Sequence, residues 1–266
     1  NNPGDAEPSM FFLEMNENGV SPLIDNCTFY NNEQFIESSA GVGVVNTGSS
    51  IQFVRCNFTK NNQNKDDEKG VIRLDQMISQ EVKFDSCIFD QNGGQCIRQA
   101  NDPKCNSYIL NCNFTNNHGH DGSCIYIIEP WNAKNNYKTK IEGCLFKGNK
   151  GTNTAGTRGC VSVDTHCVEF VGKNEFIDNE IQGISGTSKN EESYSYGGSL
   201  FIRQEVPDEF IVSGLIFTNS YSKHYGGAIG IFAGDYVGGE SAPQTVFVTI
   251  KNCIFTNCTA GKHGGA

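Results

Sequence analysis

The residues best able to do chemistry lie in one polar run, Asn117-His118-Gly119-His120-Asp121-Gly122. Two imidazoles and a carboxylate so close together offer metal ligands, or an acid–base pair for glycoside hydrolysis. The run directly follows a repeated turn, however, where polar residues are expected in any case. No second carboxylate recurs beside His118, His120 and Asp121, so we predict no catalytic residue, metal or cofactor here.

Four Asn-x-Thr sequons could accept an N-linked glycan in a secreted eukaryotic protein. Their asparagines are Asn26, Asn57, Asn113 and Asn257. Strand alternation turns the first three outward if the neighbouring Cys and Phe point inward. The other interpretation is compositional, because asparagine is abundant and the repeat places it near threonine. We keep the four as candidate glycosylation sites.

The chain has 12 cysteines, and an even, high count is typical of an oxidising compartment. Most share two repeat positions: Cys27, Cys56, Cys87, Cys112, Cys144 and Cys253 at one, and Cys96, Cys124 and Cys160 at the other. Parallel neighbours in a stack rarely have the Cβ directions that a disulfide needs, so we expect buried free thiols in these columns. Cys105 and Cys167 lie two repeats apart, too far to pair directly. No Cys-x-x-Cys is present to suggest zinc.

These residues belong to a repeat of about 30 residues that is centred on phenylalanine. The aligned phenylalanines are Phe29, Phe58, Phe89, Phe114, Phe146, Phe176, Phe217 and Phe255. Three residues later stand Asn32, Asn61, Asn92, Asn117, Asn149 and Asn179, with Ser220 and Cys258 in the last two repeats. The asparagine can adopt left-handed backbone geometry at a turn, or stack into a hydrogen-bonded ladder.

A second landmark is Gly197-Gly198-Ser199-Leu200, repeated as Gly226-Gly227-Ala228-Ile229. The slot after glycine takes small residues, which indicates close approach of two backbones. Short alternating runs such as Phe247-Val248-Thr249-Ile250 predict strands, and no segment has helical periodicity. Three short strands per repeat predict an all-β fold, a parallel β-helix of about eight rungs, right-handed by the usual crossover preference. We expect residues 1–266 to form one domain.

The Phe-x-x-Asn and Gly-Gly-Ala-Ile motifs together resemble the repeat of the chlamydial polymorphic outer-membrane proteins. The resemblance covers nearly the whole chain, although the last two Phe-x-x-Asn motifs are altered and only one Gly-Gly-Ala-Ile is complete. It implies a β-helical domain on a cell surface with a role in adhesion.

Three insertions interrupt the repeat, at 129–138, 180–196 and 233–245. Insertions in solenoids commonly build the binding face. They carry the candidate partner-binding residues Trp131, Tyr137, Tyr194 and Tyr236. The alternative for Trp131 is that it folds back onto its own strand.

Bulk composition narrows the possible partners. The net charge is -10 without a Lys/Arg cluster, so we expect no nucleic-acid partner. No apolar stretch of about 18 residues is present, so we expect no membrane-spanning helix in this segment. Only 37% of residues are hydrophobic, which suits a narrow solenoid.

We therefore expect an extracellular or cell-surface structural and adhesive scaffold that displays loops to protein or glycan partners. One alternative is a subunit of a filamentous assembly made of neighbouring copies. Another is a carbohydrate-active enzyme, although paired aspartates with Gly-His-Gly and Arg-x-Lys are not found together. The chain opens at Asn1 and stops at Gly264-Gly265-Ala266, where another repeat would begin, so we expect a fragment of a longer protein.

Overall fold

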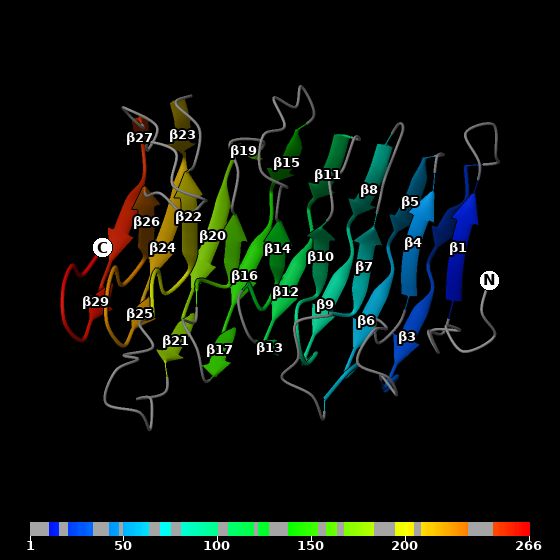
Figure 1. Cartoon of the computed structure of the whole chain (residues 1–266), viewed down its shortest axis with the longest axis horizontal. Helices are drawn as coiled ribbons and strands as arrows, with labels where there is room; N and C mark the ends of the chain where they lie inside the picture. Colours follow the sequence, from blue (N-terminus) through cyan, green and yellow to red (C-terminus); the bar gives the residue numbers. More distant parts are fainter. Residues whose placement is uncertain are drawn as a thin grey trace, which may run out of the picture.

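The chain winds as a parallel β-helix, in which each coil adds one strand to each of several long sheets (Figure 1). This computed structural model describes residues 11–15, 21–33, 43–47, 50–63, 70–75, 81–100, 106–119, 122–127, 138–153, 158–163, 168–183, 195–204, 209–233 and 247–266. All strand pairs between them are parallel, and strand order follows the chain. The predicted all-β parallel helix is confirmed.

Three sheets run along the tube and a fourth, short one closes a corner. Sheet A contains β1 (Phe11–Met15), β4 (Gly43–Thr47), β7 (Ile72–Asp75), β10 (Ile97–Ala100), β14 (Ile125–Ile127), β18 (Val161–Val163), β22 (Leu200–Gln204) and β26 (Ile229–Ala233). Sheet B contains β2 (Leu23–Asp25), β5 (Ile51–Val54), β8 (Glu81–Asp85), β11 (Asn106–Leu110), β15 (Thr139–Glu142) and β19 (Val168–Val171); the pair β23 (Glu209–Ser213) and β27 (Phe247–Lys251) follows against β19. Sheet C contains β3 (Thr28–Tyr30), β6 (Asn57–Thr59), β9 (Ile88–Asp90), β12 (Asn113–Thr115), β16 (Leu145–Lys147), β20 (Asn174–Ile177), β24 (Leu215–Thr218) and β28 (Ile254–Thr256).

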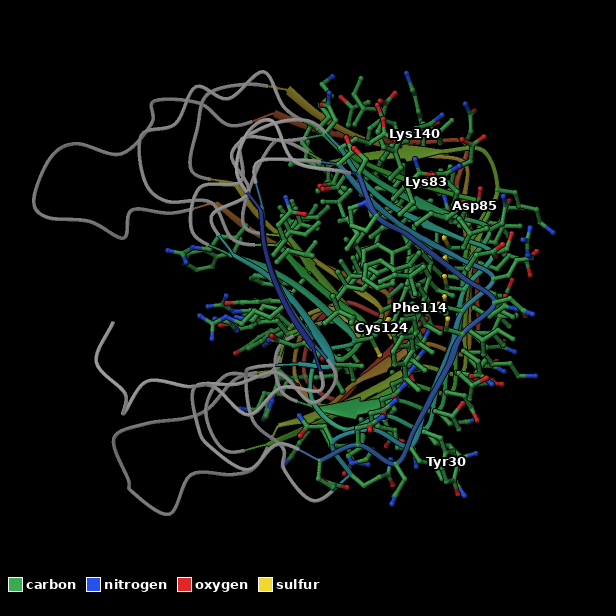
Figure 2. The ribbon with its side chains drawn as sticks, turned by 90° about the vertical axis from the view of Figure 1, so that its right-hand side faces the viewer. Tyr30, Lys83, Asp85, Phe114, Cys124 and Lys140 are labelled. Carbon is green, nitrogen blue, oxygen red and sulfur yellow. The ribbon has the colours of Figure 1, made fainter. Side chains whose placement is uncertain are left out.

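Alternation along each strand decides what enters the tube. In β8, for example, Val82 and Phe84 are buried in the core while Lys83 and Asp85 face outward. Successive strand residues point to opposite faces, so each short strand contributes one or two core side chains. Figure 2 views the tube along its length, with Phe114 inside and Lys140 outside.

The phenylalanines aligned in the sequence stand directly opposite one another in sheet C. Phe58 pairs with Phe89, Phe89 with Phe114 and Phe114 with Phe146. All neighbouring rings in this column are stacked, with centroids 4.6 to 5.1 Å apart from Phe29 to Phe255. The column fixes the register of every coil, because a slip of one residue would turn the rings to solvent.

The repeated asparagine does not supply the left-handed turn residue. Positive φ falls one residue earlier, as at Asn31 (φ 56°), Lys60 (φ 56°) and Asn116 (φ 54°). Of the asparagines that follow these residues, Asn61 and Asn117 are fully buried and Asn32 is half-buried. Of the two roles considered for this position, the ladder is therefore correct and the left-handed role is wrong.

The paired glycines meet two different requirements. Gly197 and Gly226 have φ of 65° and 60°, which only glycine adopts without cost. A Cβ on Gly227 would lie 2.2 Å from the carbonyl oxygen of Gly265 in the next coil. The close backbone approach that we placed at the small-residue slot thus occurs one residue earlier.

The fourth sheet was not expected. Sheet D contains β13 (His118–Gly119), β17 (Lys150–Asn153), β21 (Glu180–Gly183), β25 (Tyr221–Ser222) and β29 (Thr259–Ala260). Glu180–Gly183 open the insertion predicted at 180–196, yet they pair with both neighbouring coils. Tyr196, at its other end, bridges to Arg158 and Tyr225. These residues therefore belong to the repeated coil.

Candidate functional site

An asparagine ladder runs along one inner corner. The Nδ2 of Asn117 donates to the Oδ1 of Asn149 (3.1 Å) and to the carbonyl of Phe89 in the preceding coil (2.9 Å). Its Oδ1 accepts from the backbone N–H of Asn92 (2.9 Å). Every hydrogen-bonding group of this buried amide has a partner, so the repeated asparagines hold the corners together. They serve structure and are not a reacting group.

The first cysteine column makes similar corner contacts. Cys144 directs its thiol at the carbonyls of Ile109 (3.4 Å) and Glu142 (3.5 Å). Asn174 takes the cysteine position one coil later, and its Nδ2 donates to Ile141 (3.3 Å) and Val171 (3.1 Å). An amide can replace the thiol because both act there as hydrogen-bond donors.

All cysteines that the structure describes are free thiols, as predicted for the columns. Cys96, Cys124 and Cys160 are fully buried in the second column. Burial raises the pKa of Cys96 and of Cys124 well above the ordinary thiol value, since a thiolate is poorly solvated there. These thiols stay protonated and unreactive. Cys105 and Cys167 lie outside the described residues.

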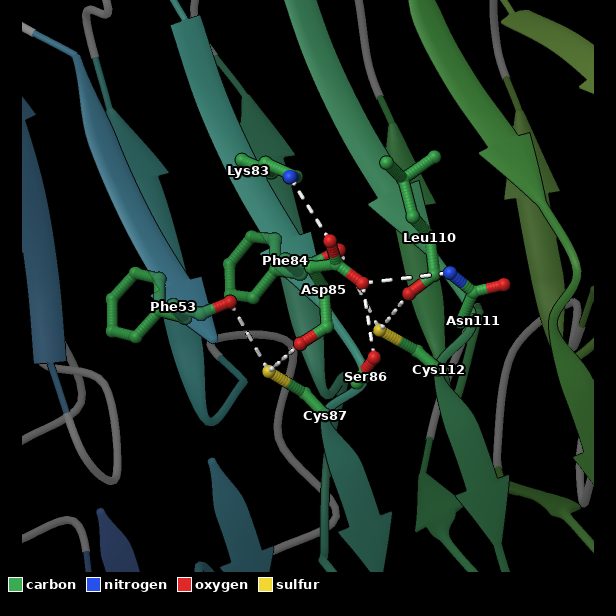
Figure 3. Close-up of polar contacts among 9 residues, drawn as sticks. All are labelled: Phe53, Lys83, Phe84, Asp85, Ser86, Cys87, Leu110, Asn111 and Cys112. Atoms are coloured by element: carbon green, nitrogen blue, oxygen red, sulfur yellow. Dashed lines mark hydrogen bonds and ion pairs between the residues drawn. The ribbon is translucent and has the colours of Figure 1, made fainter. Parts of the chain in front are cut away.

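One corner shows how the inner and outer faces differ (Figure 3). Outside, Asp85 accepts from Lys83 (2.9 Å), Ser86 (3.0 Å) and Asn111 (3.5 Å). Partial burial raises the pKa of Asp85, but these hydrogen bonds outweigh it and hold the pKa below its ordinary value. Inside, the thiol of Cys112 donates to the backbone carbonyls of Phe84 (3.7 Å) and Leu110 (3.2 Å).

The histidine run that offered chemistry is only partly within the described residues. His118 is half-buried and forms β13, where it pairs with Lys150. His120 and Asp121 lie outside the described residues, as do Trp131, Tyr137, Tyr194 and Tyr236. Among the residues that are described, no group of three or more His, Cys, Asp or Glu is placed to hold a metal ion.

The sequon asparagines lie on the outer side of the tube. On sheet C, Asn113 is exposed and Asn57 is half-buried. Their side chains point to the opposite face of the sheet from the buried rings of Phe114 and Phe58. Asn26 and Asn257 are exposed corner residues with φ of 54° and 52°. All four positions leave the amide side chain outside the core, and their glycosylation remains a prediction.

The outer face of sheet A gathers most of the arginines, a feature that the sequence alone did not reveal. Arg73, Arg98, Tyr126, Ser162, Phe201 and Gly230 stand opposite one another in successive coils. Their strand neighbours, such as Val161 and Leu200, belong to the core, so this column faces outward. Of the five arginines in the chain, Arg73, Arg98 and Arg203 lie in strands of sheet A, and Arg158 lies just before β18.

Aromatic rings position two of these guanidinium groups. The guanidinium of Arg98 lies 5.2 Å from the ring centroid of Tyr126 and donates to Gln95 (3.0 Å). That of Arg158 lies 5.1 Å from the ring centroid of Phe201. Such cation–π contacts restrain a long, flexible side chain at a defined place on the sheet.

Ser162 lies between Tyr126 and Phe201 in this column. It is fully buried, and its Oγ has no hydrogen-bond partner. A buried hydroxyl without a partner is costly, so this atom calls for an explanation.

Two further clusters lie where the chain enters sheet A. Tyr196, Tyr225 and His263 form a surface stack, with centroids 5.3 and 5.5 Å apart. Beside it, the Nδ1 of His224 accepts from the N–H of Ser195 (3.1 Å) and lies 3.0 Å from its Oγ. Ser195 is fully buried, and its Oγ also accepts from the N–H of His224 (3.0 Å). This serine–histidine pair therefore closes a corner.

Comparisons with known proteins leave the family open. No protein-family model matches the chain, and neither a curated protein nor a solved structure is significantly similar to it. The resemblance to the polymorphic outer-membrane proteins thus stays a prediction, while the parallel β-solenoid is established by the structure. Within the described part of the chain, no helix is long and apolar enough to cross a membrane.

Proposed function

We propose that this chain is an extracellular or cell-surface scaffold that binds a partner through the outer face of sheet A. The supporting observation is the contrast between the two faces of the coils. Inside, phenylalanine, asparagine and cysteine recur from coil to coil, and their side chains make ring stacks and corner hydrogen bonds within the tube. Outside, three of the five arginines of an acidic chain lie in strands of sheet A, and Arg158 lies over the ring of Phe201 on the same sheet.

A rigid rod is well suited to display. Each coil adds roughly 4.8 Å, and the phenylalanine column stacks every coil on the next, so the outer face keeps a fixed geometry over many coils. Residues on a rigid sheet hold a binding geometry better than residues on loops do. Adhesion needs such a surface and no catalytic group.

Burial of the thiols is compatible with secretion. A protonated, inaccessible thiol is a poor nucleophile, so Cys96 and Cys124 of the second column can persist in an oxidising compartment without disulfides. Glycopeptide mass spectrometry of native material across Asn26, Asn57, Asn113 and Asn257 tests this placement. Occupancy at two or more sites supports it, and bare asparagines on complete peptide coverage contradict a eukaryotic secretory route.

The function itself is tested by applying the purified chain to cell surfaces and to immobilised glycans and proteins. The scaffold proposal expects saturable attachment, with no shortening of any polysaccharide on prolonged incubation. New reducing ends would instead support a carbohydrate-active enzyme. Growth of the particles in light scattering, without attachment, would support a filament subunit.

A further inference from the structure

We propose that Cys27 and Cys56 bind a soft monovalent cation, of the class of Cu(I) and Ag(I), in line between their two sulfur atoms. Thiolate is the protein ligand that selects soft cations of this class. Two observations carry the site, which are the alignment of the two thiols in neighbouring coils and the exposure of one of them. The site lies in the first cysteine column, so it is independent of the proposed binding face on sheet A.

The two thiols occupy equivalent positions in neighbouring coils. The N–H of Asn57, the residue after Cys56, donates to the carbonyl of Cys27 (2.8 Å), so the two cysteines lie in register. The thiol of Cys27 donates to the carbonyl of Asp25 at 3.4 Å. The thiol of Cys56 donates to the carbonyl of Val54, also two residues earlier and also at 3.4 Å. Equal contacts require equal side-chain orientations, so the two sulfurs are separated by about the strand spacing, roughly 4.8 Å.

This separation suits a bridging cation better than a disulfide. A thiolate lies about 2.3 Å from a bound metal ion of this size, as it does in zinc sites, and two such bonds in line span about 4.6 Å. A disulfide instead requires the two sulfurs to lie about 2.05 Å apart, with the Cβ atoms turned toward each other. Parallel thiols of neighbouring coils can therefore hold a linear two-coordinate cation without movement of the backbone.

Charge and access select this pair within the column. On binding, each cysteine loses its thiol proton to water and each sulfur donates an electron pair to the cation, which is neither oxidised nor reduced. Two thiolates and one monovalent cation carry one net negative charge, which burial disfavours. Cys27 is exposed, so the ion can enter and the charge remains in contact with water. Deeper in the column Cys112 is fully buried, and burial raises the pKa of its thiol well above the ordinary value.

A linear site also differs in kind from a zinc site. Structural zinc takes four ligands in tetrahedral geometry, and a catalytic zinc ion takes three protein ligands. Among the residues that the structure describes, no group of three or more His, Cys, Asp or Glu is placed to supply such a set. Cys27 and Cys56 supply two ligands, which is the number that a linear complex needs. The site should therefore discriminate against zinc.

The test measures retention of Ag(I) by the full chain in native mass spectrometry, without oxygen and with excess glutathione to keep single thiols empty. The wild type should retain the ion, and Cys27→Ser and Cys56→Ser should each lose it. Serine keeps a hydrogen-bond donor for the same backbone carbonyl, so the coil contacts are preserved. The matched control is Cys144→Ser, which changes a buried thiol of the same column with a corresponding contact to Ile109 (3.4 Å). It should retain the ion.

Proton release and sulfur count separate a paired site from a single reactive thiol. Metal binding releases the protons of its thiol ligands, so the wild type should release two protons for each Ag(I) bound in weakly buffered solution. X-ray absorption at the silver edge should find two sulfur neighbours. Cys27→Ser should leave the Tm unchanged because Cys27 is exposed, so its loss of the ion cannot come from unfolding.

Several results would overturn the site. The wild type could release the ion to glutathione, or Cys27→Ser could retain it as firmly as the wild type does. Equal loss in Cys144→Ser would show that the column as a whole binds the ion and not this pair. One released proton, three or more sulfur neighbours, or displacement of Ag(I) by excess zinc would each contradict a linear pair of thiolates.

Discussion

The inner columns and the outer face of sheet A follow opposite rules. In the phenylalanine column, eight successive coils repeat one residue with one ring geometry. On the outer face of sheet A, six successive coils carry five residue types, which are Arg, Tyr, Ser, Phe and Gly. The inner positions have the same neighbours in every coil, so the same side chain packs best in each of them. The outer positions do not have this packing constraint, so their side chains can differ from coil to coil and can form a binding surface.

The largest effect should follow from breaking the ring column at its middle. Phe114→Ala removes a fully buried ring that stacks at 4.8 Å on Phe89 and at 5.0 Å on Phe146. We expect a loss of about 3–5 kcal/mol in the free energy of unfolding, measured by denaturant titration. The control is Phe255→Ala, because Phe255 is 37% exposed and stacks only on Phe217 among the described residues. Equal losses at the two sites would contradict a column stabilised by two-sided burial.

The asparagine ladder should be next in sensitivity. Asn117→Leu leaves the N–H of Asn92 and the carbonyl of Phe89 without their partners inside the tube. Each buried unpartnered group costs about 1–3 kcal/mol, so we expect a loss of about 2–4 kcal/mol. Asn113→Leu, four residues earlier and exposed on sheet C, should change the stability by less than about 0.5 kcal/mol. A similar loss in both variants would show that the buried ladder contributes no more to the free energy of unfolding than an exposed asparagine does.

Alkaline pH should destabilise the inner thiol column. Burial raises the pKa of Cys124 in the folded chain well above the 9.0 of an unperturbed thiol. Its contribution to stability is therefore complete below pH 9.0 and declines above it, where the unfolded chain loses the proton first. The slope should be about 1.4 kcal/mol per pH unit for each such thiol.

Cys124→Ala introduces the residue that occurs naturally at the equivalent position of the column, Ala228. It should reduce the pH dependence of the free energy of unfolding by the contribution of one thiol. The measurement is urea unfolding at several pH values between neutral and alkaline. An unchanged slope in this variant would show that Cys124 is not the group that titrates.

The smallest effect is expected outside, at Asp85. Its pKa is lowered in the folded state, so its contribution is present above its ordinary pKa of 3.8 and is lost as the pH falls through the folded-state value. Because the carboxyl and Lys83 are partly exposed, Asp85→Asn should cost less than about 1 kcal/mol at neutral pH and nothing in acid. A larger loss, or one that persists in acid, would contradict an outer face that contributes little to folding.

The repeat, its register, the phenylalanine column and the asparagine ladder could be predicted from the sequence. Each depends on local alternation of side chains and on one residue type that recurs in successive coils. Phe29 to Phe255 align without a gap in the structure. Sheet D escaped prediction because its strands, such as Tyr221–Ser222, are too short to show a pattern. The arginine face escaped as well. Arg73, Arg98 and Arg158 lie 25 and 60 residues apart in the sequence, and only the winding of the coils brings them to one face.

The most direct test of the account compares two faces of the same tube. Arg98→Gln/Arg158→Gln neutralises two cations on sheet A, and Lys83→Gln/Lys140→Gln neutralises two on sheet B. Saturable attachment to cell surfaces is measured for both double variants and the wild type at one ionic strength. The account predicts that binding is lost in the sheet A variant and retained in the sheet B variant. Equal loss in both, or retained binding in the sheet A variant, would contradict it.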